Sequence, residues 1–383
     1  MKRIIFLIAF LIMHTGLPNM VSASEIPDVS SGAAIVMDAK TGEVLYEKNS
    51  IVRMYPASLT KVATAIYAIE RGNLDDIVTV SKDARQVEGT RVYLEEGEKA
   101  PLRKLLQGLI INSGNDAAVA IAEHLDGSIE KFAENLNEYL YKIGVTHTNF
   151  ENPHGLYHSE HLTTAKDLAI ITQYAMKNEE FRKIFGTTEL NWDGESWDTT
   201  LFTHHKLMRE RPYDGVTGGK TGYIDQSGHT LLTTAKRGDT SLIVVTLNGS
   251  TQEVAYEDTT ALLDYAFLHY RTSRIPIGTT LISAGNKYTT TKDYYFTQSA
   301  NQNTTKRLKT DGTLEIFDQN QILLTSIKMD EMELEWNEAI KVKEKSTEKK
   351  DKELTGLISS FSIGLLLTLL SIFIFRYRRK KFL

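Results

Sequence analysis

The sequence predicts an α+β fold, because strand-like segments at both ends of one region enclose a mostly helical middle. Residues 32–50 carry apolar and β-branched runs around a turn at 38–42, which indicates a hairpin. Residues 102–143 and 163–177 are typical of helices, with breaks at 112–116 and 126–127. Residues 228–250 form two extended runs around a turn at 236–239, and residues 257–270 return to helix. We therefore expect a sheet that both ends of this region build together.

Length and composition favour two folded domains in a chain of 383 residues, 41% of them hydrophobic. We expect residues 24–272 to form the α+β domain. From residue 273 to residue 336 the pattern changes to short β-type runs with turns, which predicts a small all-β domain. The absence of cysteine excludes disulfides, thiolate metal sites and cysteine nucleophiles. A net charge of -5, without a long basic patch outside the tail, gives no reason to expect binding to nucleic acid.

Both ends of the chain indicate export and anchoring. Residues 1–23 have a basic start, an apolar run and a small-residue cleavage site, as a signal peptide does. Residues 354–375 are uncharged and about long enough to cross a bilayer as a helix, and the basic tail 376–383 follows at once. Residues 337–353 read as a charged linker. We expect a single-pass protein of the cell membrane, with its folded body outside and its tail in the cytoplasm.

The segment "YPASLTKVATAIYAIERG", residues 55–72, predicts a helix that Pro56 opens and Gly72 ends. Ser58 lies on its apolar side, and Lys61 projects there one turn later. An ammonium against apolar surroundings loses hydration, so we expect a lowered pKa and a neutral amine that can act as a base. The alternative is structural, with Ser58 as a helix cap and Lys61 lying along the surface.

Three short motifs gain meaning from their order and placement. Ser-x-x-Lys, Ser-x-Asn and Lys-Thr-Gly each occur more than once in the chain, so a single match carries little weight. Only one set of matches is placed as an active site would need. Ser58 and Lys61 lie at the start of an apolar helix, "SGN" at 113–115 lies in a break between two helices, and "KTG" at 220–222 leads into a strand. These are the three elements that penicillin-binding proteins and class A β-lactamases share.

The resemblance extends to the serine D-Ala-D-Ala carboxypeptidases, the low-molecular-weight penicillin-binding proteins. "ASLTK", "SGNDAAVAIAEHLDGS", "NPHGL", "TTAKDLA" and "GGKTGYID" are similar to that family's signatures, and the similarity covers about residues 30–270. It implies a β-lactamase/transpeptidase-like catalytic domain, an antiparallel sheet with helices, followed by a β-rich domain. Within the family, the chain resembles a spore-cortex carboxypeptidase of Gram-positive bacteria.

The resemblance also implies roles for individual residues. Ser58 is the expected nucleophile, Lys61 its base, and Ser113 a proton relay. The substrate, a peptidoglycan stem peptide ending in D-Ala-D-Ala, would be held by Asn115, Lys220, Thr221 and Tyr223. Backbone N–H groups of Ser58 and Tyr223 would form the oxyanion hole. β-Lactam antibiotics would be inhibitors, and no cofactor or metal is implied.

Several features leave alternatives open. A β-lactamase is the alternative enzyme, but residues 150–169 contain no Glu-x-x-Leu-Asn sequence, which would supply its second base. The alternative without catalysis is a silent scaffold that binds the cell wall. Where the family commonly has an asparagine, "THHKLM" places His204 and His205. The histidines at 154, 158 and 161 are expected to be solvated rather than metal ligands. Glycines at 218, 219 and 222 fit a strand that substrate backbone approaches closely.

Overall fold

The computed structural model describes residues 26–332, 346, 350, 367–368 and 370–372. The predicted signal peptide and basic tail lie outside the described residues, as do most residues of the predicted linker and of the predicted membrane-spanning segment. Among the residues described, no helix is long and apolar enough to cross a bilayer. These residues form two compact units, the first made of residues up to 273 together with 295–302, and the second of residues 274–294 and those after 302.

The first unit is built on a five-stranded antiparallel sheet of order β2-β1-β9-β8-β7. Its strands are β1 (Ala33–Asp38), β2 (Val44–Lys48), β7 (Val216–Ile224), β8 (Gly228–Arg237) and β9 (Thr240–Gly249). Strand β1 from the amino-terminal hairpin pairs with β9, from Ala33 opposite Leu247 to Asp38 opposite Leu242. The sheet is therefore assembled from both ends of the region, as the sequence predicts.

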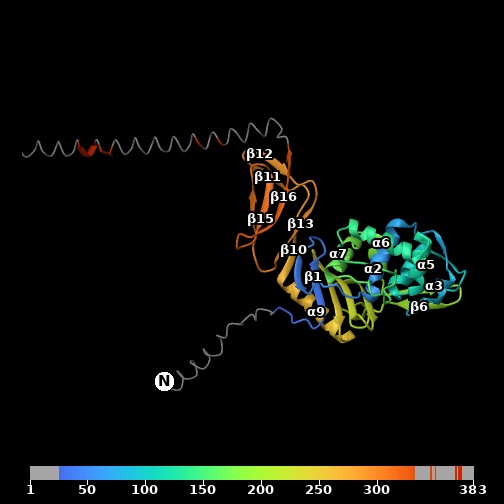
Figure 1. Ribbon diagram of the computed structural model, residues 1–383. Helices are drawn as coiled ribbons and strands as arrows, with labels where there is room; N and C mark the ends of the chain where they lie inside the picture. Colours follow the sequence, from blue (N-terminus) through green and yellow to red (C-terminus); the bar gives the residue numbers. More distant parts are fainter. Residues whose placement is uncertain (1–25, 333–345, 347–349, 351–366, 369, 373–383) are drawn as a thin grey trace, which may run out of the picture. The chain divides into compact units, whose positions relative to one another are not determined.

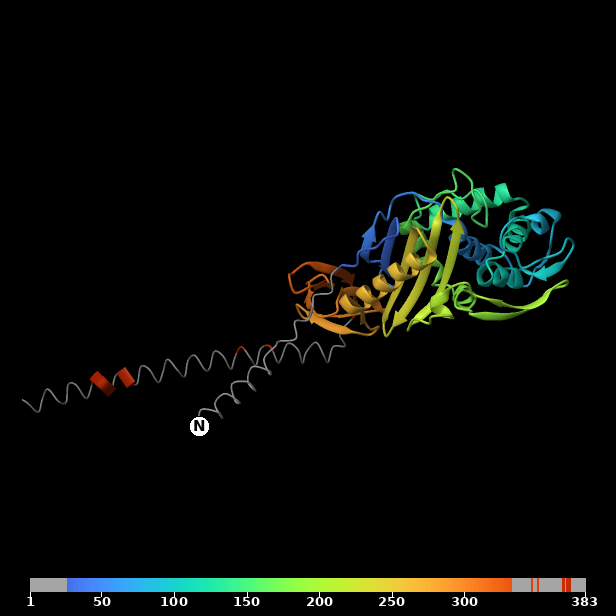
Figure 2. The ribbon, with the colours of Figure 1, turned by 90° about the horizontal axis from the view of Figure 1, so that it is seen from below.

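Helices cover both faces of this sheet, because its inner strands are apolar on both sides. On β1, Ile35 and Met37 belong to the larger core, while Ala34 and Val36 belong to a smaller one. Alternate residues of a strand point to opposite faces, so one short run serves both cores. The smaller core is closed by α9 (Gln252–His269), which Figure 2 shows lying along one face of the strands.

The larger core holds the helical middle of the chain, and Figure 1 shows α2, α5, α6 and α7 gathered on one side of the sheet. The helices are α2 (Thr60–Arg71), α3 (Lys82–Gln86), α4 (Leu102–Ile111), α5 (Asn115–Asp126), α6 (Ile129–Lys142), α7 (Ala165–Ala175) and α8 (Glu179–Phe185). The short pairs β3 (Ile77–Thr79) with β4 (Lys99–Pro101), and β5 (Glu189–Asp193) with β6 (Asp198–Phe202), lie between them in sequence. The breaks predicted at 112–116 and 126–127 are present, since Gly127 ends α5 in the left-handed conformation.

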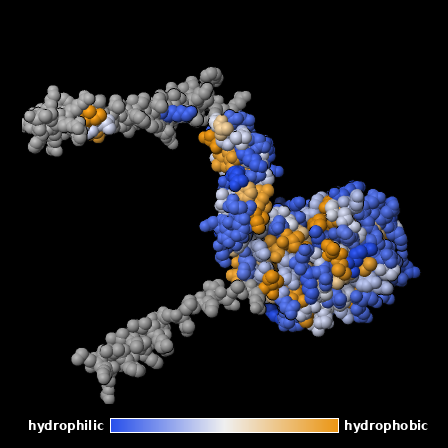
Figure 3. Space-filling view, turned by 60° about the vertical axis from the view of Figure 1, so that its left-hand side comes forward, coloured by the Kyte–Doolittle hydropathy of each residue, from blue (hydrophilic) through white to orange (hydrophobic). Residues whose placement is uncertain are grey.

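The second unit consists of short strands, in keeping with the expected β-rich character. One three-stranded sheet has the order β11-β12-β17, made of Thr280–Ser283, Asn286–Thr289 and Asp330–Met332. The other has the order β14-β15-β16, made of Thr305–Leu308, Thr313–Phe317 and Leu323–Lys328. Strand β10 (Tyr270–Ile275) pairs with β13 (Tyr294–Ser299), most of which groups with the first unit. In the space-filling view, apolar patches are scattered over a largely hydrophilic surface (Figure 3).

Candidate active site

Ser58 lies in a short 3-10 turn rather than in the α-helix expected from residue 55. The turn η1 spans Ala57–Leu59, and α2 begins only at Thr60. Ala57 has a φ of 48°, a left-handed conformation that a non-glycine residue rarely adopts. Gly155 packs directly against this turn, since a Cβ on it would lie 1.9 Å from the Ala57 carbonyl oxygen. The turn therefore fixes Ser58 at the front of α2 in a backbone that local propensity does not favour.

Lys61 is fully buried, with three oxygen atoms around its amine. Its Nζ lies 2.8 Å from Ser58 Oγ, 2.7 Å from Asn115 Oδ1 and 2.8 Å from the His154 carbonyl oxygen. No carboxylate is among these three partners. Burial first, and the charge of Lys220 second, hold the pKa of Lys61 well below its ordinary value, although Asp116 opposes them. The structure thus provides a buried amine, biased toward its neutral form, within hydrogen-bond distance of a serine hydroxyl.

Asn115 connects the first two motifs. It is the first residue of α5, and its side-chain amide donates to the Glu88 carbonyl oxygen at 2.6 Å while its oxygen accepts from Lys61. Gly89 makes this contact possible, because a Cβ there would lie 2.7 Å from Asn115 Nδ2. The side chain is therefore held from both ends. In this structure it orients Lys61, a role the sequence interpretation did not assign to it.

Ser113 and Lys220 meet across the cavity from the Ser58 turn. Ser113 has a φ of 64° and precedes α5, and its Oγ accepts a hydrogen bond from Lys220 Nζ at 2.9 Å. The same ammonium donates to the Thr221 carbonyl oxygen at 2.8 Å. Burial lowers the pKa of Lys220 to about 7. The charge of Lys220 is therefore sensitive to pH near neutrality.

Strand β7 runs beside the Ser58 turn, and its glycines make that approach possible. A Cβ on Gly222 would lie 2.8 Å from the Ser58 backbone nitrogen. A Cβ on Gly219 would lie 2.3 Å from the ring of His205, and one on Gly218 would lie 2.4 Å from the ring of Phe185. Close packing inside the protein therefore explains Gly218 and Gly219, where the sequence suggested approach by substrate. Gly222 alone of the three borders the serine.

These elements enclose an open cavity of about 430 Å³. Four of the residues predicted for the site line this cavity, namely Ser58, Ser113, Thr221 and Tyr223. The other three do not line it but are hydrogen-bonded within the site: Lys61 to Ser58, Asn115 to Lys61, and Lys220 to Ser113. Tyr223 is exposed, with its hydroxyl 3.0 Å from Asp225 and its ring tilted against His229. His204, which the sequence marked as a departure from the family pattern, also lines the cavity. Sequence reasoning missed the other lining residues, which are Thr90, His229, Thr230, Leu231, Gln252, Ala255 and Tyr256.

The three loop histidines expected to be solvated behave differently from one another. His154 and His161 are buried, and burial lowers the pKa of each to about 3. The Nε2 atom of His161 lies 2.8 Å from Thr60 Oγ1, and its Nδ1 accepts from the Glu151 backbone. The expectation is wrong for these two, which brace the loop behind Lys61, while His158 remains exposed. The described residues contain no cluster of three or more histidine and carboxylate side chains suited to a metal ion.

Comparison with known proteins gives one consistent family. Residues 20–251 match the family described as D-alanyl-D-alanine carboxypeptidase, peptidase S11. The D-alanyl-D-alanine carboxypeptidase DacF of Bacillus subtilis is 36% identical over 249 residues, which are 63% of this chain. DacD of Escherichia coli is 31% identical over 287 residues, 70% of this chain and 72% of that protein. The chain spans 63% of the length of DacF, a little under two thirds.

Solved structures show the same likeness. Penicillin-binding protein 6B of Escherichia coli superposes with a TM-score of 0.68 at 27% identity, covering 82% of this chain and 99% of that one. A D-alanyl-D-alanine carboxypeptidase of Mycobacterium tuberculosis gives a TM-score of 0.60 at 29% identity, covering 64% of this chain and 94% of that one. Both agree with the α+β transpeptidase-like fold of the first unit.

Proposed function

Because the chain belongs to the D-alanyl-D-alanine carboxypeptidase family, peptidase S11, we propose that it removes the terminal D-alanine from peptidoglycan stem peptides ending in D-Ala-D-Ala. The observation that carries the proposal is the 2.8 Å contact of Lys61 Nζ, a fully buried amine, with Oγ of Ser58, which lines the open cavity. That pair supplies a nucleophile and a base without a histidine or a carboxylate.

In this mechanism neutral Lys61 takes the proton of Ser58 as Oγ attacks the carbonyl carbon of the penultimate D-alanine. The oxygen of the tetrahedral intermediate is stabilised by the backbone N–H groups of Ser58 and Tyr223. The C–N bond then breaks, a proton reaches the leaving amine by way of Ser113, and D-alanine departs. Water hydrolyses the resulting ester, which regenerates Ser58 and releases the shortened peptide.

Residues of the Lys-Thr-Gly strand, β7, would bind the substrate. Lys220 and the Thr221 hydroxyl would hold the terminal carboxylate, and a bound carboxylate favours the charged form of Lys220. Asn115 keeps Lys61 oriented, and Tyr223 lies at the edge, where the peptide backbone would pass. No cofactor takes part in these steps.

A β-lactamase is the second candidate, since its first step is the same. Fast hydrolysis of its acyl-enzyme would require a second base, yet none of the described residues lining the cavity carries a carboxyl group. Asp116, whose charge influences the pKa of Lys61, is buried and accepts hydrogen bonds from the backbone N–H groups of Val92 and Leu94. The structure therefore favours the carboxypeptidase. The assembled serine and lysine pair likewise argues against a silent scaffold.

We also propose that the protein is exported and held in the cell membrane by residues 354–375, with the catalytic unit outside. The signal-like start and the apolar segment with its basic flank support this topology. The role in the spore cortex rests on resemblance within the family and stays a prediction.

The function is tested by release of D-alanine from diacetyl-Lys-D-Ala-D-Ala. Wild-type protein should release one D-alanine per peptide, and Ser58→Ala none above background. Lack of release by correctly folded wild-type protein would refute the proposal.

A further inference from the structure

Tyr93 is an exposed aromatic residue in the same loop that supplies Thr90 to the cavity. It is 54% exposed, although Val92 and Leu94 on either side of it are buried. Its φ is 57°, a left-handed conformation that a tyrosine rarely adopts. Within residues 26–332, no hydrogen bond to its hydroxyl is found. The loop therefore presents a tyrosine side chain to solvent at the cost of a strained backbone.

A buried carboxylate holds the backbone on both sides of Tyr93. Asp116, the second residue of α5, accepts the Val92 N–H at 3.0 Å and the Leu94 N–H at 3.1 Å. Burial of a carboxylate is costly unless the group is hydrogen-bonded, and these bonds satisfy it while they fix the residues that flank the tyrosine. The strained conformation is thus imposed by tertiary structure, which is the pattern found at functional sites.

Two further side chains join Tyr93 in what we call the aromatic platform, made of Arg91, Tyr93 and Trp197. The Trp197 ring, from the turn between β5 and β6, meets the Tyr93 ring edge to face, with centroids 4.9 Å apart. The Arg91 guanidinium stands 5.5 Å from the centre of the same ring. Sugar rings present C–H groups that are attracted to the negative face of an aromatic ring, and their hydroxyls pair with phenol and guanidinium groups. The chemistry of the platform fits a sugar.

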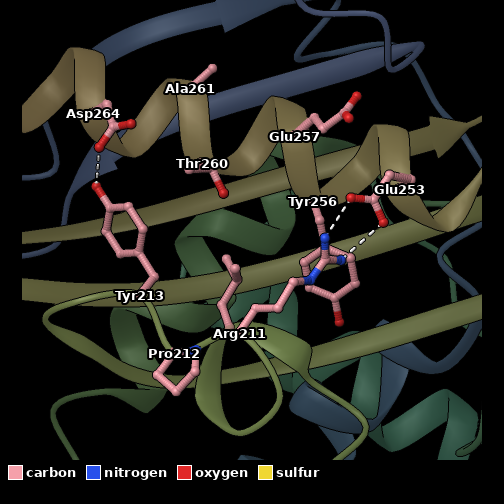
Figure 4. A pocket seen from close by; sticks show the side chains of 10 residues that line it. Arg211, Pro212, Tyr213, Glu253, Tyr256, Glu257, Thr260, Ala261 and Asp264 are labelled. Atoms are coloured by element: carbon pink, nitrogen blue, oxygen red, sulfur yellow. Dashed lines mark hydrogen bonds and ion pairs between the residues drawn. The ribbon is translucent and has the colours of Figure 1, made fainter.

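A larger hollow elsewhere in the first unit lacks such free groups. It measures about 490 Å³ and lies between α9 and the loop at 207–213 (Figure 4). Dashed lines in the figure join Arg211 to Glu253 and the Tyr213 hydroxyl to Asp264. These pairs tie α9 to the loop, so the guanidinium and the phenol of this hollow already have a structural use.

Thr90 connects the platform to the cavity. It lines the cavity together with Ser58, and its carbonyl oxygen accepts the Asn115 N–H at 2.7 Å. Tyr93 follows three positions later, so its Cα lies at most about 11 Å from that of Thr90. In a stem pentapeptide the sugar is joined to the first residue and the scissile bond follows the fourth, a span of up to about 14 Å. The platform is therefore within reach of the sugar when the end of the peptide lies at Ser58.

We propose that the aromatic platform binds the N-acetylated sugar to which the stem peptide is attached, so that this protein prefers peptides on a glycan to free peptides. Tyr93 and Trp197 contact the sugar ring, and Asp116 is the positioning residue that holds Tyr93 outward. The inference deepens the proposed function and rests on it for the identity of the peptide.

Binding to an inactive background tests the inference separately from catalysis. In Ser58→Ala, calorimetry would compare a pentapeptide ending in D-Ala-D-Ala with the same peptide carrying N-acetylmuramic acid on its amino end. We expect the sugar to tighten binding on the order of tenfold, and addition of Tyr93→Ala to remove most of that advantage. Tyr93→Phe, which keeps the ring, should retain most of it. Tyr141→Ala, which removes a tyrosine that is 72% exposed on α6, is the matched control and should retain all of it.

Tyr93→Asn separates binding from folding. Asparagine adopts the left-handed region more readily than tyrosine, so this variant should melt no lower than the wild type and still lose the advantage of the sugar. The inference is overturned if the two peptides bind Ser58→Ala equally, or if Tyr93→Asn and Tyr141→Ala keep the same advantage. Should a preference that depends on Tyr93 persist while wild-type protein releases no D-alanine, the inference would stand and the proposed function would fail.

Discussion

Asn115 Oδ1 lies 2.7 Å from Lys61 Nζ, joining two motifs that are 54 positions apart in the chain. Together with Ser58 Oγ and the His154 carbonyl oxygen, it surrounds the amine with neutral oxygen atoms. A carboxylate in any of these places would stabilise the ammonium more strongly than a neutral acceptor does and would favour its protonated form. Because its three hydrogen-bond partners are uncharged, Lys61 is suited to act as a base rather than to form an ion pair.

The first prediction concerns this base. Lys61→Arg keeps a positive charge but cannot lose its proton, so D-alanine release should fall by about a hundredfold or more. The rate of acylation by penicillin should fall in parallel, because the same proton transfer is needed. Circular dichroism would check that the variant is folded. Near-normal turnover by a folded Lys61→Arg protein would exclude the role of Lys61.

The second prediction is a pH profile. Activity requires Lys61 without its proton and Lys220 with its proton. Since the pKa of Lys61 lies well below its usual value and that of Lys220 is about 7, kcat/KM should rise and then fall, with the decline beginning near neutrality. The decline in kcat should lie at higher pH, because the bound carboxylate stabilises the Lys220 ammonium.

Lys220→Arg provides the control for this assignment. A guanidinium stays charged throughout the range, so the decline at high pH should disappear even if the rate is lower. A decline that stays at the same pH in Lys220→Arg would assign it to another group.

Much of the fold follows from sequence pattern, for reasons visible in single elements. The apolar run beside a turn predicted β1, whose residues are buried in two cores. The helix expected at 163–177 is α7 (Ala165–Ala175), which begins after Thr164 accepts from the Asp167 N–H. The 3-10 turn at Ser58 could not be predicted from periodicity or capping, because it packs against Gly155, which is distant in the sequence. Local propensity carries no signal for such a turn.

In the candidate site, too, some groups could be predicted from sequence motifs and others could not. Ser58, Lys61, Ser113 and Lys220 stand in motifs, so their approach to one another could be expected from the resemblance. The groups that hold them include backbone atoms, such as the His154 carbonyl oxygen on Lys61 and the Glu88 carbonyl oxygen on Asn115. Any residue can supply a carbonyl oxygen, which is why sequence alone did not point to these partners.

The third prediction tests the packing behind Ser58 with two glycines of similar conformation. Gly155 has a φ of 90° and Gly144 a φ of 93°, so alanine at either position is strained by about 1 kcal/mol. Only at 155 does the new Cβ collide, with the Ala57 carbonyl oxygen, because nothing lies within 4 Å of a Cβ at 144. Gly155→Ala should therefore lose most acylation by penicillin, and Gly144→Ala should keep it.

Thermal unfolding would separate stability from activity in this pair. We expect both variants to melt below the wild type, and Gly155→Ala by more. Equal acylation rates in the two variants would show that the turn at Ala57 does not depend on Gly155.

The fourth prediction concerns topology. A protein shortened before residue 354 should be released from the membrane after signal cleavage and remain active, because it would lack the proposed anchor at 354–375 and keep both folded units. Fractionation followed by the D-alanine assay would measure this. Recovery of the shortened protein in the membrane fraction would locate the anchor elsewhere.

The last prediction joins the Ser58 and Lys61 pair to the lack of a second base. A β-lactam mimics the D-Ala-D-Ala end, so Ser58 should open its ring with Lys61 as base, and Lys220 should hold the drug's carboxylate. The opened ring keeps its leaving group attached to the acyl-enzyme, whereas D-alanine diffuses away and lets water in.

None of the described residues that line the cavity bears a carboxyl group to activate that water. Hydrolysis should therefore take minutes or longer, and mass spectrometry after penicillin treatment should find one drug mass on the peptide containing Ser58 and none in Ser58→Ala. Turnover of penicillin many times per second without a detectable adduct would replace the carboxypeptidase assignment with a β-lactamase.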